Sequence, residues 1–318
     1  MYKKIYDNPD IYTIYIPLPD NPLKNLNCYV VKTKDNNLII DTGFNSPVCY
    51  EALMSGLNEL DIDINKTEMF LTHMHSDHTG LVSSEMREDS VIYMSEVDYE
   101  YVKLMLNNYW VKNEEDYVKE GFPKDELATL WTSNPAKIYN PDKLFNITAV
   151  SDNSKFNIGN YEFTCISTPG HTPGHMCLYL KKEKILFSGD HILFDISPNI
   201  TRWPMVENSL KDYIDSLQKI KGYEVKLTLP AHRNNDMDLY HRVDELIHHH
   251  ELRLEEVFEI VTANSGLNAY DIAGKMKWSL KAKNWSEAPA QQKWFAVGET
   301  LAHLDYLEID NKIYKELI

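Results

Sequence analysis

Short apolar runs that end in polar turns fill most of the first 235 residues. Runs of this kind have the length of buried β-strands and lie at 28–31, 38–40, 69–72, 91–94, 161–168, 176–180, 185–187 and 225–229. Apolar residues at helical spacing predict helices over 48–60 and from about 208 to 220, where Asn208 or Ser209 can cap the start. This part of the chain is therefore expected to combine strands and helices.

Residues 95–140 differ from their surroundings because they are helical in pattern and rich in large side chains. One interpretation is a helical pair that packs its own core, which is the usual fate of aromatic residues. The other is an insertion, over about 95–145, that caps a site and forms an apolar acyl pocket. Trp110 in this segment and Trp203, in Arg202-Trp203-Pro204, are the predicted pocket walls.

The strand pattern stops near residue 235, where we place a domain boundary between 1–235 and 236–318. One long helix is predicted over 238–263, ending near Gly266, a second from about 268, and a third over about 286–304. The tail from Leu307 to Ile313 alternates around an Asp-Asn turn like a small hairpin. Three helices and a hairpin are the outline of a winged helix.

Composition narrows the class of protein. The chain has 318 residues, 43% hydrophobic and 25% charged, which is typical of a globular protein. It has no stretch of roughly 20 apolar residues and no apolar signal-peptide core near its start, so we expect a cytoplasmic protein without membrane contact. A net charge of -16 repels phosphate backbones, although a local basic groove could overcome this.

Metal-binding residue types gather in one short segment. His73-x-His75-x-Asp77-His78 directly follows an apolar strand, and a loop there could direct two imidazoles to one ion and the Asp and His to a second. The four cysteines form no CxxC pair, so metal chemistry must come from imidazoles and carboxylates. These ligands suit zinc, iron or manganese.

Three more candidate ligands follow predicted strands. They are His171 in Thr-Pro-Gly-His-Thr, Asp190 in Ser-Gly-Asp, and His232 in Leu-Pro-Ala-His. Ligands at the ends of several strands converge on one edge of a sheet, where loops build sites. Five imidazoles and two carboxylates, one able to bridge, fit two metal ions.

This set of motifs, over about residues 10–235, resembles the metallo-β-lactamase superfamily. The resemblance implies a four-layer αβ/βα sandwich with two divalent ions, most simply zinc. It implies that His73, His75 and His171 hold one ion, that Asp77, His78 and His232 hold the other, and that Asp190 bridges them. Asp77 and Asp190 would also be the catalytic carboxylates. Asp41, in Asp-Thr-Gly at a strand end, would orient the ligands.

Asp190 further suggests the branch, because class B β-lactamases typically have Cys near that position. The ligand set is similar to that of glyoxalase II-like hydrolases. The C-terminal region resembles the winged-helix appendage of a branch of those hydrolases that includes single-strand endoribonucleases. The expected function is a dinuclear hydrolase that uses a metal-bridging hydroxide on a carbonyl ester, above all a thioester of a small-molecule acyl substrate.

Other functions remain open. A metal-dependent endoribonuclease or phosphodiesterase would use the winged helix, and a lactonase would share the ester chemistry. Residues 241–318 carry nine Lys and Arg against thirteen Asp and Glu, whereas DNA-binding winged helices are usually basic. The complete ligand set argues against a catalytically inactive binding protein.

Several remaining residues have less specific interpretations. His191 is predicted to be structural, His175 to pack at a strand start, and His248-His249-His250 to lie on a solvated helix face. Lysines 275, 277, 281 and 283 could contact a phosphorylated carrier such as coenzyme A or form a solvated turn. A homodimer through the C-terminal helices is a further expectation.

Overall fold

The computed structural model describes residues 2–19, 21–82, 90–107 and 109–315, apart from the side chains of 109–111 and 133. A seven-stranded sheet has its strands in chain order, and its last four strands are parallel. The strands are β1 (Tyr2–Tyr6), β2 (Asp10–Pro17), β3 (Asn25–Lys32), β4 (Asn37–Ile40), β5 (Thr67–Phe70), β6 (Ile92–Ser95) and β7 (Thr148–Val150).

A second, five-stranded sheet has the order β12-β11-β10-β9-β8. Its strands are β8 (Lys155–Ile158), β9 (Tyr161–Ser167), β10 (Met176–Leu180), β11 (Ile185–Gly189) and β12 (Leu227–Pro230). Within this sheet, β11 and β12 run parallel and the other described pairs of neighbours run antiparallel. The two sheets meet at one corner, where Asn27 and Tyr29 of β3 donate side-chain hydrogen bonds to the carbonyl oxygen of Pro230.

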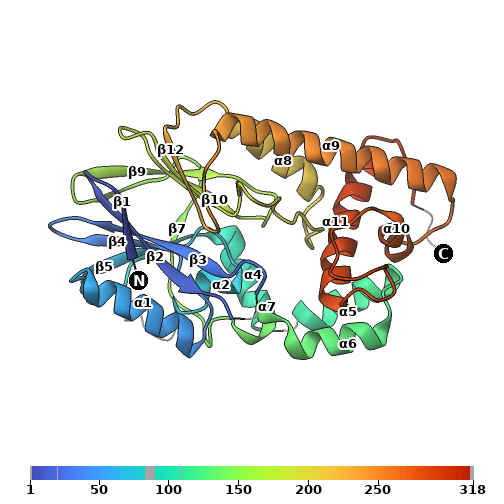
Figure 1. Cartoon of the computed structure of the whole chain (residues 1–318), viewed down its shortest axis with the longest axis horizontal. Helices are drawn as coiled ribbons and strands as arrows, with labels where there is room; N and C mark the ends of the chain where they lie inside the picture. Colours follow the sequence, from blue (N-terminus) through green and yellow to red (C-terminus); the bar gives the residue numbers. More distant parts are fainter. Residues whose placement is uncertain (1, 20, 83–89, 108, 316–318) are drawn as a thin grey trace.

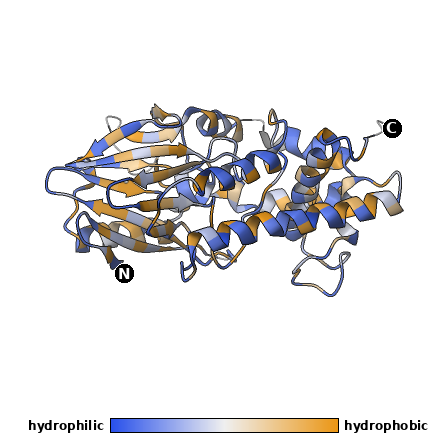
Figure 2. Ribbon diagram, turned by 90° about the horizontal axis from the view of Figure 1, so that it is seen from above, coloured by the Kyte–Doolittle hydropathy of each residue, from blue (hydrophilic) through white to orange (hydrophobic). Residues whose placement is uncertain are grey.

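Helices cover the outer face of each sheet (Figure 1). Helix α1 (Pro47–Glu59) packs on the first sheet, and α8 (Ser209–Ile220) and α9 (Leu239–Ala263) pack on the second. Between the sheets lies a buried cluster that includes Phe70, Phe163 and Phe187. Figure 2 shows largely hydrophobic strands, whereas the outer helices mix hydrophobic and hydrophilic residues. The expected αβ/βα sandwich is confirmed.

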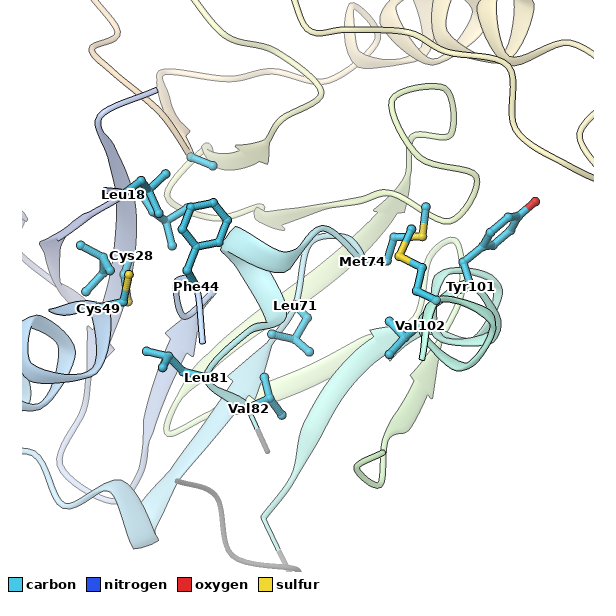
Figure 3. Packing of buried hydrophobic residues seen from close by; sticks show 14 of the residues in the cluster. Leu18, Cys28, Phe44, Cys49, Leu71, Met74, Leu81, Val82, Tyr101 and Val102 are labelled. Atoms are coloured by element: carbon cyan, nitrogen blue, oxygen red, sulfur yellow. The ribbon is translucent and has the colours of Figure 1, made fainter. Parts of the chain in front are cut away.

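The remaining helices gather beside the sandwich (Figure 1). They are α2 (Ser76–Thr79), α4 (Glu96–Met105), α5 (Tyr109–Lys119), α6 (Lys124–Ser133), α7 (Pro135–Ile138), α10 (Ala269–Lys275) and α11 (Ala290–Ile309), and a 3-10 turn, η1, spans Ile64–Lys66. One hydrophobic cluster runs from the α1 side of the first sheet to these helices. In Figure 3 Met74 lies near Tyr101 and Val102 of α4.

Each predicted strand and helix outside the C-terminal hairpin has a counterpart in the structure, which adds the strands β1, β2, β7 and β8, and one predicted element is corrected. The expected hairpin at Leu307–Ile313 is wrong, because residues 307–309 continue α11 and no strand follows β12 among residues described up to 315. Leu307 and Leu304 pack against the other C-terminal helices. This packing stabilises a helical conformation of the segment in place of a hairpin. The C-terminal region therefore has the three helices expected of a winged helix but, in its described part, no wing.

Candidate metal centre

The metal-binding residue types all follow the ends of strands at one edge of the sandwich. His73 and His75 come directly after β5, and Asp77 and His78 lie on the short helix α2. His171 lies in the loop between β9 and β10. Asp190 follows β11 and His232 follows β12, and these two strands are parallel neighbours. Their carboxyl ends therefore meet at the same edge.

The first cluster consists of three imidazoles that face one point. His75 Nδ1 lies 3.0 Å from His73 Nε2 and 3.1 Å from His171 Nε2. Two nitrogens bound to the same tetrahedral zinc at 2.0–2.1 Å would lie about 3.4 Å apart. The spacing therefore fits three ligands of one ion after a shift of a few tenths of an ångström.

The second cluster combines Asp77, His78 and His232, whose ligand atoms lie within 4.8 Å of one another. Asp77 Oδ2 lies 3.3 Å from His232 Nε2 and 3.7 Å from His78 Nε2. Asp190 lies between the clusters. Its Oδ1 is 3.4 Å from His232 Nε2, and its Oδ2 is 3.6 Å from His171 Nε2.

The state of the buried polar atoms shows that a divalent ion fits this site. His78 Nε2, His232 Nε2 and Asp190 Oδ1 are buried and have no hydrogen-bond partner among the residues that the structure describes. Leaving such atoms unpaired is costly. All three atoms point into the same space, so a shared cation would satisfy them together.

The electrostatics agree with this interpretation. Burial, together with the neighbouring imidazoles, lowers the pKa of His73 and lowers that of His75 to about 3, so both rings are uncharged, the form in which an imidazole can bind a metal ion. Burial opposes charge on His232 too, but Asp190 and Asp77 raise its pKa. The carboxylates of the second cluster thus draw in positive charge, which a metal ion can supply in place of a proton.

In His78, His171 and His232, the ring nitrogen that faces away from the site is Nδ1, and it lies within hydrogen-bond distance of an oxygen. Asp41 Oδ2 lies 2.8 Å from His78 Nδ1. The main-chain oxygen of Asn199 lies 2.9 Å from His171 Nδ1, and that of Asn25 lies 2.9 Å from His232 Nδ1. If each Nδ1 donates to its oxygen, the lone pair of Nε2 faces the site. Asp41 thus lies where the predicted orienting carboxylate should lie.

Asp98, near the start of α4, is a site residue that the sequence pattern did not reveal. It is fully buried and accepts hydrogen bonds from Met74 N (3.0 Å), Thr172 Oγ1 (2.7 Å) and Gly174 N (2.5 Å). It therefore joins the loop of His73 and His75 to the loop of His171. Its only sequence signal is an Asp in the first turn of a helix, which usually indicates a helix-end charge.

The sequence also predicts two tryptophans as pocket walls and two histidines as structural residues. Trp203 is buried beside the site, with its ring 6.0 Å from that of His75 and its Nε1 donating to the His171 carbonyl at 3.0 Å. The side chain of Trp110 lies outside the described residues. His175 Nε2 accepts from the main-chain N–H of Asp190 at 3.2 Å. His191 is buried and belongs to neither ligand cluster in the described part of the chain.

The solvated face predicted for residues 248–250 is partly wrong. His248 is exposed, but His250 is fully buried. Its Nδ1 lies 3.2 Å from His303 Nε2 of α11. The helix α9 packs against α11 on this side, and the periodicity of α9 alone could not show that partner.

Fold and site together define a metal-binding αβ/βα sandwich enzyme. Residues 22–232 match the metallo-beta-lactamase superfamily, so the chain belongs to this superfamily of hydrolases. A lactamase-like protein, nscB, of Neosartorya fischeri is 26% identical over 75% of this chain and 57% of its own length. A lactamase-like protein, adaB, of Aspergillus niger is 25% identical, covering 88% of this chain and 83% of its own.

A third relative is the atrochrysone carboxyl ACP thioesterase dmxR1 of Cryptosporiopsis sp., 25% identical over 70% of this chain and 53% of its own length. The chain thus spans between 53% and 83% of these relatives. A metallo-beta-lactamase family protein of Thermus thermophilus has the same fold, with a TM-score of 0.79, 24% identity, and 96% and 95% of the two chains covered. That coverage includes most of the C-terminal helices. No helix in the described part of this chain could span a membrane.

Proposed function

We propose that this chain is a dinuclear metal-dependent hydrolase that cleaves a thioester of a small acyl substrate. The observation that carries the metal part is Asp190, whose two carboxylate oxygens face the two different ligand clusters. His73, His75 and His171 would hold one divalent ion, and Asp77, His78 and His232 would hold the other. Zinc, iron and manganese all accept these ligands.

The chemistry of such a site divides between the ions and the chain. Bound divalent ions act as Lewis acids and lower the pKa of water. Burial keeps His73 and His75 uncharged. Oxygens of Asp41, Asn199 and Asn25 orient His78, His171 and His232. Asp77 and Asp190 supply the negative charge that draws the ions in, and the buried ring of Trp203 closes one side next to His75.

Two observations support a thioester. One relative is named an acyl-carrier-protein thioesterase, and the imidazole cluster borders an apolar wall of Trp203 and Tyr101, whose rings lie 5.7 Å apart. A lactonase would use the same ester chemistry. An endoribonuclease has less support, because the net charge is -16 and the described C-terminal residues form helices without a hairpin wing.

The division into residues 1–235 and 236–318, the cytoplasmic location, the glyoxalase II-like branch and a homodimer stay predictions. A pocket that includes Trp110 also stays a prediction.

A side-by-side hydrolysis assay tests the proposed function. The metal-loaded protein is given glutathione and coenzyme A thioesters of short and long chains, a lactone, and a labelled single-stranded RNA, with Asp190→Ala as the blank. We expect thioester turnover that is lost in the blank and in chelated protein. RNA cleavage with inert thioesters would contradict the proposal and favour the nuclease.

A further inference from the structure

The loop of residues 199–203 holds His171 at two points. The main-chain oxygen of Asn199 lies 2.9 Å from His171 Nδ1, and Trp203 Nε1 donates to the carbonyl oxygen of His171 at 3.0 Å. The first contact sets the ring, and the second sets the main chain. The position of this loop therefore determines where His171 Nε2 points.

The same loop is fastened to the C-terminal helix α11. The N–H of Arg202 donates to the carbonyl oxygen of Gly298 at 3.3 Å, and its Nε donates to Asp305 Oδ2 at 2.6 Å. A second nitrogen of Arg202 contacts the other oxygen of Asp305, which makes the pair bidentate. The side chain of Asn199 reaches Glu299 Oε2 at 3.4 Å.

A third element fixes Arg202 from the side of the insertion. Its Nη1 donates to Glu120 Oε1, just after α5, at 2.9 Å. The side chains of Arg202, Asp305 and Glu120 are 29%, 18% and 15% exposed. A half-buried, bidentate Arg–carboxylate pair has a fixed geometry, so the loop cannot shift without breaking it.

We infer that α11 positions a metal ligand: Arg202, anchored on Asp305, holds the 199–203 loop and thereby orients His171. The C-terminal helices thereby take part in forming the metal centre, although α11 lies more than a hundred residues beyond His171 in sequence. Arg202 is a positioning residue, because in the described part of the chain its side chain bonds to Asp305 and Glu120 and to no residue of the ligand clusters. The inference rests on the proposed metal site.

The test replaces Arg202 by Met and, as a conservative rescue, by Lys. The matched control is Lys293→Met, which removes another buried ion pair of α11, with Glu126 of α6, that does not touch the loop. Zinc affinity is measured by competition with a chelator, and Co²⁺ absorption reports ligand geometry. His171→Ala shows which binding step belongs to the first cluster, and circular dichroism and Tm monitor folding.

We expect Arg202→Met to weaken that step about 10-fold or more, as loss of other outer partners of metal ligands does, and to change the Co²⁺ spectrum. The other step should stay unchanged, and Arg202→Lys should recover part of the loss. Lys293→Met should lower Tm but leave both steps unchanged. If Arg202→Met does not fold, Asp305→Asn takes its place with the same expectation.

Wild-type affinity in folded Arg202→Met, or an equal loss in Lys293→Met, would overturn the inference while leaving the proposed function intact. A wild-type protein that binds no divalent ion would instead overturn the proposed function.

Discussion

At the scale of single residues, Asp41 is the most informative partner of a ligand. Its main chain is left-handed, with φ of 60°, a conformation that Asn tolerates as well as Asp. Its Oδ1 accepts from Thr72 N at 2.9 Å and its Oδ2 faces His78 Nδ1. An Asn there can keep the first contact, but its NH₂ group opposes the donor at His78 Nδ1.

We therefore expect Asp41→Asn to lower metal affinity about 10–100-fold without unfolding the protein. Metal content after dialysis against a chelator measures this. Asp61→Asn is the matched control, because Asp61 is exposed and also has a positive φ, of 53°. Equal metal content in the two variants would contradict the orienting role of Asp41.

The buried carboxyl of Asp98 predicts that the stability of the fold depends on pH. Burial raises the pKa of this carboxyl to about 6, although three hydrogen-bond donors oppose the shift, whereas in the unfolded chain its pKa is about 3.9. Between about pH 4 and pH 6 the folded chain thus holds a proton that the unfolded chain has released. The stability that Asp98 contributes is therefore lost as pH rises through this window.

Urea denaturation of metal-free wild type and Asp98→Asn at several pH values checks this. The free energy of unfolding of wild type, relative to the variant, should fall between about pH 4 and pH 6. A difference that stays constant or rises with pH would show that the three donors outweigh burial.

The residue types of the site were predictable, and its connections were not. His73, Asp190 and the other proposed ligands follow short apolar strands, so a local pattern indicates them. Asp98 joins two loops more than ninety positions apart, through Met74 and Thr172. Such a partner becomes visible only when tertiary contacts are known.

At the scale of elements, α2 depends on one glycine. A Cβ at Gly80, which directly follows α2, would lie 2.6 Å from the main-chain oxygens of Gly43 and Ser76. Main-chain atoms cannot move aside as a flexible side chain can. The helix that carries Asp77 and His78 is thus packed directly against the loop after β4.

We expect Gly80→Ala to destabilise the protein by about 1–3 kcal/mol, the usual cost of overpacking, and to lower its metal content. Gly222→Ala is the control, since within the described residues the one close neighbour of its Cβ would be Lys219 O, at 3.2 Å. Urea denaturation measures both variants, and equal midpoints for them would contradict this packing.

The predicted elements agreed where burial follows a simple period and failed where two helices share a contact. The alternation at residues 307–313 suggested a hairpin, but Leu307 is buried among α9 and α10 as part of a helix. His250 is likewise buried by α11. In both cases a partner distant in sequence determines the environment.

At the scale of the whole molecule, the insertion and the C-terminal helices are packed together. Lys293 of α11 pairs with Glu126 of α6 at 2.8 Å, and Leu127, Leu130, Val297 and Leu301 share one hydrophobic cluster. The predicted boundary near residue 235 is therefore crossed by a continuous core. The insertion is therefore held against α11 by an ion pair and by shared hydrophobic packing.

Metal removal should destabilise the whole chain, because binding to the folded state alone adds about 4 kcal/mol when free metal is about 1,000 times Kd. We expect a chelator to lower Tm of wild type and to have a smaller effect on His171→Ala. The exposed His248 provides the control, and His248→Ala should respond like wild type. A wild-type Tm that the chelator leaves unchanged would contradict the stabilisation of the folded chain by bound metal.

The most direct test of the central claim is an anomalous-scattering map from crystals of the zinc-loaded protein. We predict two peaks in each chain, roughly 3.5–4 Å apart as in other two-metal sites. One should contact His73, His75 and His171, and the other Asp77, His78 and His232, with Asp190 between them. A single peak, or peaks away from these side chains, would contradict the dinuclear site.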